Sequence, residues 1–314
     1  MKKLIANKIC RLKKIITDVS IYGYKKTFTL LVKEMWATFG NILYYLPPPS
    51  FRKYKLPRAN IRLMITSHCN LNCIGCNAFS PLAKEEFLSP KVVKNDLKKL
   101  SSIHNGKIQY IGLSGGEPLL HPDLLKITDL VEQFFPSAYH EITTNGILLN
   151  SQNDTFWENL KKNKFCICIT RYPISLPFNE IKIKAEKFQI SCYYGAGTDE
   201  NIRIMSKTPL NLKGNENKVK MFRACSKANN CTFIHHGKIF QCPVIVNITI
   251  FNDYFKTNLK VHKKDYFNLN SAKNFDQILD FLRKPIPFCR YCSIHKKVYG
   301  IQWKKSEKQL SEWV

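Results

Sequence analysis

Acidic residues are scarce in this chain. Asp and Glu together number 23, against 49 Lys and Arg, so the 314-residue sequence carries a formal net charge of +26 at pH 7. This excess of one sign predicts affinity for an anionic partner: a nucleic acid, a membrane surface or a phosphorylated substrate. The lysines are scattered along the whole chain rather than massed in one tract, so a general bias of composition explains the charge equally well.

Long apolar runs are also missing. No run approaches the roughly 18 to 20 apolar residues that a membrane-spanning helix needs. Near the N-terminus Arg11, Lys14 and Asp18 interrupt every apolar stretch before the hydrophobic core of a secretory signal could form. Disulfide frameworks belong mainly to short secreted domains, whereas this chain spreads 12 cysteines over 314 residues. We therefore expect a cytoplasmic protein whose reduced thiols bind metal.

Residues 1–58 are predicted to form a basic helical extension. Between residues 28 and 46 apolar side chains recur at helical spacing, and Pro47, Pro48 and Pro49 end the helix. Such a helix can bury its apolar stripe on the main domain, or lie on an anionic membrane surface beside its basic neighbour. We expect docking on the main domain, with association at a membrane surface as the alternative.

From Ile61 onward, short apolar runs alternate with helix-like segments, which is the pattern of parallel β/α units. The predicted strands are 61–66, 108–113, 139–143, 165–170, 190–194 and 202–205. Six such units suffice for an α/β fold of the partial (β/α)6, TIM-like barrel type. In such folds ligand chemistry gathers at the loops that follow the carboxyl ends of the strands.

The domain boundaries follow from changes in composition. A polar stretch with Pro209, Gly214 and a polar run from Asn215 predicts a linker. The expected parts are an extension over 1–58, a barrel core over 59–206, a linker over 207–222, a cysteine-rich domain over 223–295 and a polar tail over 296–314.

Three cysteines lie close together after the first predicted strand. Cys69, Cys73 and Cys76 place three soft ligands within eight residues, so one loop can hold three corners of a cuboidal iron–sulfur cluster. One iron would then stay open to an outside molecule. A zinc knuckle completed by His68 or by a distant cysteine is the alternative.

A second motif, Ser114-Gly115-Gly116-Glu117-Pro118, follows the second predicted strand. Its two glycines let a small ligand approach the main chain, and Glu117 or the exposed carbonyls can accept hydrogen bonds from an ammonium group. By itself the segment is a turn with a helix start at Pro118.

In this order the two motifs closely resemble those of radical S-adenosylmethionine (radical SAM) enzymes. The resemblance implies that Cys69, Cys73 and Cys76 bind a 4Fe-4S cluster whose open iron is chelated by the methionine part of SAM. It also implies that the residues from Ser114 to Pro118 contact that cofactor.

The third predicted strand ends in Thr143-Thr144-Asn145-Gly146, which resembles the ribose-contacting segment of the same family. Thr144 and Asn145 are the cofactor contacts this implies, and a helix-starting Asn-Gly turn is the alternative. One departure is Gly75, because the family usually has an aromatic residue there that touches the adenine. The adenine site is therefore left unassigned.

The C-terminal cysteines Cys225, Cys242, Cys289 and Cys292 resemble the auxiliary-cluster domain called SPASM, in its shorter Twitch form. The resemblance implies a second 4Fe-4S cluster. Cys231 competes with Cys225 for one ligand position, although the spacing favours Cys225. A structural zinc site built from two pairs of cysteines is the alternative.

The resemblance also implies the activity. An external flavodoxin- or ferredoxin-like donor would supply an electron, SAM would be cleaved to methionine and a 5′-deoxyadenosyl radical, and that radical would abstract hydrogen from a substrate. Arg171, just past the fourth strand, is a candidate contact for an anionic group of the substrate, or else a solvated arginine.

The substrate is predicted to be small and glycan-related, with oxidation or epimerisation as the oxidoreductase-type reaction. About 60 residues precede the barrel, which is short for a peptide-recognition domain, and residues 76–81 resemble radical enzymes of bacterial polysaccharide loci. A peptide- or protein-modifying maturase is one alternative. A zinc-bearing nucleic-acid-binding protein is another, but it leaves Gly115 and Gly116 without a role, so we expect no nucleic-acid partner.

Overall fold

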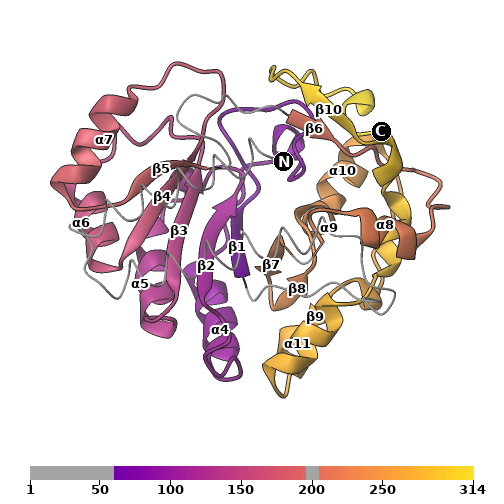
Figure 1. Ribbon diagram of the computed structural model, residues 1–314, viewed down its shortest axis with the longest axis horizontal. Helices are drawn as coiled ribbons and strands as arrows, with labels where there is room; N and C mark the ends of the chain where they lie inside the picture. Colours follow the sequence, from indigo (N-terminus) through magenta and orange to yellow (C-terminus); the bar gives the residue numbers. More distant parts are fainter. Residues whose placement is uncertain (1–59, 196–204, 229) are drawn as a thin grey trace, which may run out of the picture. The chain divides into compact units, whose positions relative to one another are not determined.

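An eight-stranded sheet organises the part of the chain that the computed structural model describes, namely residues 60–195, 205–228 and 230–314 (Figure 1). Its order is β5-β4-β3-β2-β1-β7-β8-β9. Neighbouring strands run parallel from β5 to β7, and β8 and β9 are added antiparallel. The strands are β1 (Asn60–Thr66), β2 (Tyr110–Gly115), β3 (Tyr139–Thr144), β4 (Phe165–Thr170), β5 (Cys192–Gly195), β7 (Thr232–His235), β8 (Lys238–Phe240) and β9 (Phe267–Asn268).

The α/β fold with a mostly parallel sheet is confirmed, and so are the first five predicted strands. The sixth predicted strand, residues 202–205, is tested at Met205 alone. Residues 202–204 lie outside the described ranges, and β6 (Met205–Lys207) pairs antiparallel with β10 (Val298–Ile301) in a separate two-stranded sheet. The edge of β1 pairs instead with β7 from the cysteine-rich segment, whose short apolar run satisfies the backbone groups of that edge. The predicted extension over 1–58 also lies outside the described residues.

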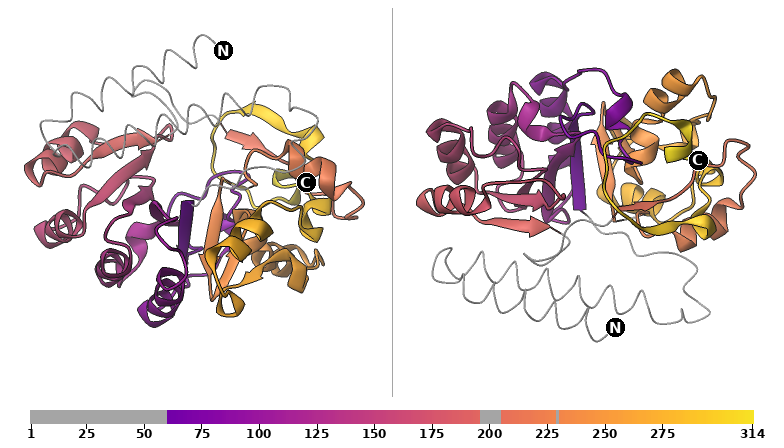
Figure 2. Two further views of the ribbon diagram at one scale, coloured as in Figure 1. Left: turned by 60° about the horizontal axis from the view of Figure 1, so that its bottom comes forward. Right: turned by 90° about the horizontal axis from the view of Figure 1, so that it is seen from above.

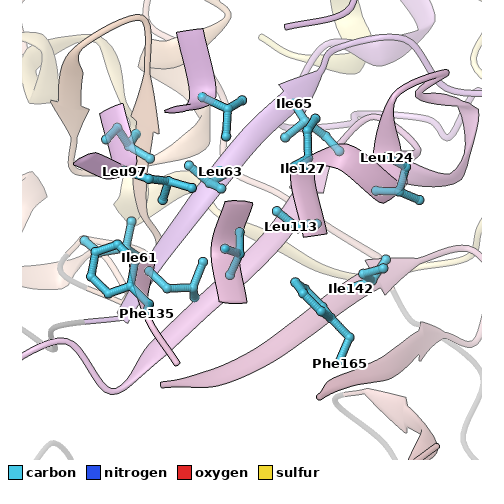
Figure 3. Packing of buried hydrophobic residues seen from close by; sticks show 14 of the residues in the cluster. Ile61, Leu63, Ile65, Leu97, Leu113, Leu124, Ile127, Phe135, Ile142 and Phe165 are labelled. Carbon is cyan, nitrogen blue, oxygen red and sulfur yellow. The ribbon is translucent and has the colours of Figure 1, made fainter. Parts of the chain in front are cut away.

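Four helices cover one face of the parallel strands, as the left panel of Figure 2 shows. They are α4 (Pro90–Ser101), α5 (Leu124–Phe134), α6 (Asp154–Lys162) and α7 (Phe178–Lys187). Because side chains alternate along a strand, Ile61, Leu63 and Ile65 of β1 all face this layer, where they join a core with Leu97 and Ile127 (Figure 3). Burial of this apolar face fixes the register of β1 and turns Arg62 to the opposite face.

A second apolar cluster joins the residues after the first cysteines to the C-terminal half. The rings of Phe79 and Phe251 lie 5.2 Å apart, and Trp313 lies within 6.4 Å of both. The helices of this half are α8 (Lys218–Ala224), α9 (Pro243–Val246), α10 (Ile248–Phe255) and α11 (Phe275–Leu282). No helix within the described ranges has both the length and the apolar character to cross a membrane.

His235 makes the stability of this half depend on pH. Its Nδ1 donates a hydrogen bond to the Met64 carbonyl at 3.0 Å, across the β1–β7 seam. Burial first, and then the charge of His236, lowers the pKa of His235 to about 4. The unfolded chain therefore takes up this proton at higher pH than the folded chain, so the contribution to stability is complete above pH about 6.5 and is lost towards pH about 4.

We expect the midpoint of urea unfolding to fall between pH 6.5 and pH 4, and to fall less steeply in His235→Gln. The carboxylates that titrate in the same range are the same in both proteins. The difference between the two pH profiles of the urea midpoint therefore gives the contribution of His235. Parallel pH profiles for wild type and variant would contradict the assignment.

Candidate functional site

Three loops meet at one edge of the sheet. They follow the carboxyl ends of β1, β2 and β3, which are adjacent strands. We call them the cysteine loop (residues 69–76), the glycine loop (residues 114–118) and the asparagine loop (residues 144–146). Parallel strands carry their ligand chemistry at this edge, so the predicted site residues are brought together by topology.

The thiols of the cysteine loop are close enough to influence one another. Burial raises the pKa of Cys69, the hydrogen bond from Leu71 N opposes the rise, and the charges of Glu117, Cys76 and Cys73 add to it, so that the pKa is about 12. Cys73 is buried, and the other two are half-buried. Three neighbouring thiols are soft donors of the kind that three ligand positions of an iron–sulfur cluster need. Bound iron would also stabilise their ionised form, which burial disfavours. In the described residues no three His, Cys, Asp or Glu side chains are arranged as donors to a single metal ion.

The C-terminal segment (residues 303–314) is fastened to the cysteine loop. Ile74 N donates to the Lys304 carbonyl at 3.0 Å, and Ser306 N donates to the Asn72 carbonyl at 2.8 Å. The indole Nε1 of Trp313 donates to the carbonyl of Cys76 at 2.9 Å. The backbone of the loop is therefore held from both sides, by β1 at its start and by the C-terminal segment along its length.

Gly75 is explained by the same segment. Its φ is +59°, and a Cβ at this position would lie 3.2 Å from the carbonyl oxygen of Glu312. A left-handed φ favours glycine, and the backbone of the C-terminal segment leaves little room for a larger side chain. The contact that an aromatic residue would make from this position is absent here.

The glycine loop lies directly against the chain that leaves β1. Gly116 N donates to the Thr66 carbonyl and Glu117 N to the His68 carbonyl, both at 2.8 Å. A Cβ on Gly115 would lie 2.0 Å from Thr66 O, and one on Gly116 would lie 1.9 Å from His68 O. Both glycines are therefore required by the close approach of two backbones. The Oγ of Ser114, at the start of the loop, is buried without a hydrogen-bond partner in the described chain, which leaves it available to a ligand.

Glu117 is a buried tether between loops. Its carboxylate accepts hydrogen bonds from Leu119 N at 3.0 Å, Thr144 Oγ1 at 2.7 Å and Asn145 N at 2.8 Å. Burial raises the pKa of Glu117 to about 6, and these three donors limit the rise. The side chain thus fixes the glycine loop to the asparagine loop.

Asn145 completes the connection by reaching the cysteine loop. Its Nδ2 lies 2.8 Å from Asn70 Oδ1 and 3.8 Å from the sulfur of Cys69. The predicted cofactor residues Thr144 and Asn145 are therefore in the site, in contact with the glycine loop and the cysteine loop respectively.

The C-terminal thiols form a second group. Cys225 follows α8, Cys242 precedes α9, and Cys289 and Cys292 lie in and after the 3-10 helix Pro287–Tyr291. Burial raises the pKa of Cys242 to about 11 and that of Cys289 to about 12, and Cys225 adds to both shifts. Burial also raises the pKa of Cys292, with Cys242, Cys289 and Cys225 adding to it.

Cys231 interacts with fewer of these thiols than Cys225 does. Burial raises its pKa, Arg62 and Lys227 lower it, and Cys225 is the single thiol among the described residues that acts on it. Cys225, in contrast, acts on each of Cys242, Cys289 and Cys292.

Arg171, the candidate contact for the substrate, follows the end of β4. Its guanidinium lies over the ring of Tyr194, 5.1 Å from the centroid, and that ring stacks on Phe178 of α7 at 4.1 Å. Tyr194 belongs to the core beneath the helices, so Arg171 is directed to the helix-covered side of the sheet. Its Nη1 is buried there without a hydrogen-bond partner in the described residues.

The sequence interpretation missed the polar residues on the other face of the sheet. Arg62 of β1, Tyr110 of β2, Glu141 of β3 and Tyr193 of β5 interact with one another there. The available signal was a charged residue between buried neighbours in two predicted strands: Arg62 between Ile61 and Leu63, and Glu141 between His140 and Ile142.

Residues 63–177 match the model of the Radical SAM superfamily. The chain carries a radical SAM domain. The match includes the cysteine, glycine and asparagine loops, and the C-terminal cysteines lie beyond it. The predicted family resemblance is confirmed for this part of the chain.

Curated relatives of this radical SAM domain include two annotated cyclases. A probable GTP 3′,8-cyclase of Methanothermobacter marburgensis is 35% identical over 98 residues, which is 31% of this chain and 30% of that protein. The GTP 3′,8-cyclase of Aquifex aeolicus is 29% identical over 104 residues, or 32% of each chain. The matches therefore span about a third of the length of these relatives.

The solved structures that the chain matches are more distant in sequence. BtrN in complex with AdoMet and 2-DOIA is 17% identical, with 74% of this chain and 92% of that chain covered at a TM-score of 0.47. SuiB of Streptococcus suis bound to its precursor peptide SuiA is 17% identical, with 54% and 37% covered at a TM-score of 0.34.

Proposed function

We propose that this radical SAM domain binds a 4Fe-4S cluster through Cys69, Cys73 and Cys76 and uses SAM to remove a hydrogen atom from a small substrate. The observation that carries the proposal is the meeting of three interacting thiols with the glycine and asparagine loops at one sheet edge. When bound and reduced, the cluster supplies the electron that splits SAM into methionine and a 5′-deoxyadenosyl radical. An external flavodoxin- or ferredoxin-like protein is the proposed donor.

The residues of the chain position and enclose these groups. Glu117 holds the glycine loop and the asparagine loop in one arrangement, and Asn145 lies against the sulfur of Cys69. Ser114 presents an unpartnered hydroxyl beside the backbone of Gly115 and Gly116, where an amino or carboxylate group of SAM finds partners.

A second 4Fe-4S cluster is proposed on Cys225, Cys242, Cys289 and Cys292, within an auxiliary domain over 223–295 that follows a core over 59–206. Its support is the mutual interaction of these four thiols. Such a cluster would accept an electron from a substrate radical as that radical is oxidised, or would help to bind the substrate.

For the substrate we propose a glycan-related small molecule that is oxidised or epimerised. A nucleotide is the second candidate, because the curated relatives are named GTP 3′,8-cyclase and the chain carries 49 cationic residues.

Anaerobic reconstitution of the full chain tests this function. We expect about eight irons per chain and cleavage of SAM to 5′-deoxyadenosine that depends on added reductant. Stoichiometric zinc without cleavage would instead indicate the zinc-bearing class of protein. Incubation with deuterated sugars, nucleotides and peptides, followed by mass spectrometry of 5′-deoxyadenosine, then identifies the molecule that gives up hydrogen.

A further inference from the structure

The face of the sheet opposite the helices α4 to α7 carries a polar group that we call the inner-face cluster. Its members are Arg62, Tyr110, Glu141, Thr143 and Tyr193, which come from β1, β2, β3 and β5. Charged side chains in the middle of a buried sheet are costly unless they are paired and hydrogen-bonded. The contacts of each charged side chain therefore show whether the cluster is purely structural or can also bind a ligand.

Glu141 is fully satisfied by its neighbours. Tyr110 Oη donates to its Oε1 at 2.6 Å, Thr143 Oγ1 donates to the same oxygen at 3.1 Å, and Tyr193 Oη donates to Oε2. Burial alone would raise the pKa of Glu141, but the charge of Arg62 and these hydrogen bonds lower it below its ordinary value. The carboxylate is therefore ionised and needs no further partner.

Arg62 is satisfied at one nitrogen. Its Nη1 donates to Thr143 Oγ1 at 3.0 Å and lies 3.6 Å from Glu141 Oε1, and the guanidinium lies over the ring of Tyr110. Within the described chain its Nε and Nη2 make no hydrogen bond, although a guanidinium carries five N–H donors. The side chain keeps 27% of its surface accessible, against 9% for Glu141. A purely structural ion pair would pair these donors, whereas this one leaves Nε and Nη2 without a partner in the described chain.

Arg62 is connected to the asparagine loop through Thr143 and interacts with the thiol of Cys231. Thr143, its hydrogen-bond partner, directly precedes Thr144 and Asn145 of the proposed SAM site. On the other side, β1 pairs with β7, and Cys231 precedes that strand. Burial would lower the pKa of Arg62, but Tyr110, Glu141 and the thiols of Cys231 and Cys168 raise it.

We infer that Arg62 anchors an oxyanion of the substrate, a phosphate or a carboxylate, on the inner face of the sheet. A planar fork of N–H donors matches such a group, and Glu141, Thr143 and Tyr110 are positioning residues that fix the plane of the fork. The inference rests on the proposed function, since it names the part of the substrate that the radical site would receive.

Calorimetric titration of the reconstituted full chain with SAM tests the inference, using inorganic pyrophosphate and citrate as separate probes. We expect wild type to bind at least one of them, and the preferred probe tells phosphate from carboxylate. Arg62→Gln should weaken that binding at least tenfold. Arg62→Lys keeps the cation beside Glu141 but loses the fork, so it should weaken binding severalfold. Arg283→Gln, which removes an exposed arginine after α11, is the matched control and should bind like wild type.

Three results would overturn the inference: wild type binds neither probe, Arg62→Gln binds like wild type, or Arg171→Gln loses binding while Arg62→Gln keeps it. If Arg62→Gln fails to fold, the affinity of Arg62→Lys for the probe decides the question. An affinity equal to that of wild type would contradict binding through the planar N–H donors of Arg62. Cleavage of SAM by wild type is scored separately. Cleavage without oxyanion binding defeats this inference alone, and oxyanion binding without cleavage defeats the proposed function.

Discussion

Replacing Cys69, Cys73 and Cys76 together by Ala is expected to lower the iron content from about eight to about four atoms per chain and to reduce cleavage of SAM at least about 1000-fold. The physical reason is that these three thiols are the soft donors of one loop, and without them no iron remains to chelate SAM. Iron analysis and chromatography of 5′-deoxyadenosine after anaerobic reconstitution measure both effects.

The reciprocal variant is the control for this experiment. Changing Cys225, Cys242, Cys289 and Cys292 to Ala should also leave about four irons, now on the cysteine loop. Cys231→Ala should keep all of them, because Cys231 acts on Cys225 but on none of the other three thiols in the described residues. Loss of all iron from the first variant would show that the two groups of thiols do not hold separate clusters.

Substituting Gly116 by Ala is expected to destabilise the protein by at least about 3 kcal/mol. The new methyl group would lie 1.9 Å from the carbonyl oxygen of His68 and 2.4 Å from its carbon. Neither atom belongs to a flexible side chain, so the glycine loop or the cysteine loop must move. A shift of either breaks the hydrogen bond from Gly116 N to the Thr66 carbonyl and displaces Glu117 from its partners.

Thermal unfolding measures this effect, and the midpoint should fall by at least about 5 °C for a protein of 314 residues. Gly106→Ala is the matched control, since it adds the same methyl group at a φ of +71° with nothing within 4 Å. It should cost about 1 kcal/mol, the price of the left-handed backbone alone. Equal shifts in the two variants would mean that the clash at Gly116 is relieved without disturbing the loops.

Strands and loops could be predicted from the sequence wherever the pattern lies within a few neighbouring residues. Five strands were predicted from short apolar runs, and the loops that follow three of them were recognised from their cysteines and glycines. β7 was missed because four residues, Thr232–His235, are too few to show a period, and only the unpaired edge of β1 gives them a place. The role of Glu117 as a tether was equally hidden, since its partners lie 27 and 28 residues away.

The polar residues on the inner face were also predictable only in part. Arg62 stands between Ile61 and Leu63, so its orientation away from the helices follows from the alternation of β1. Its partners come from other strands and could not be inferred from spacing. Arg171 was chosen because it follows a strand end, and its contact with the ring of Tyr194 could not be inferred from that position.

The attachment of the C-terminal segment to the cysteine loop sets an order for maturation. Trp313 and its acceptor, the carbonyl of Cys76, are 237 residues apart in the sequence. During synthesis the thiols therefore leave the ribosome long before Lys304, Ser306 and Trp313 can fasten the loop. Iron delivered at that early stage would meet an unfastened loop, so we expect stable cluster insertion to wait until translation of the segment is complete.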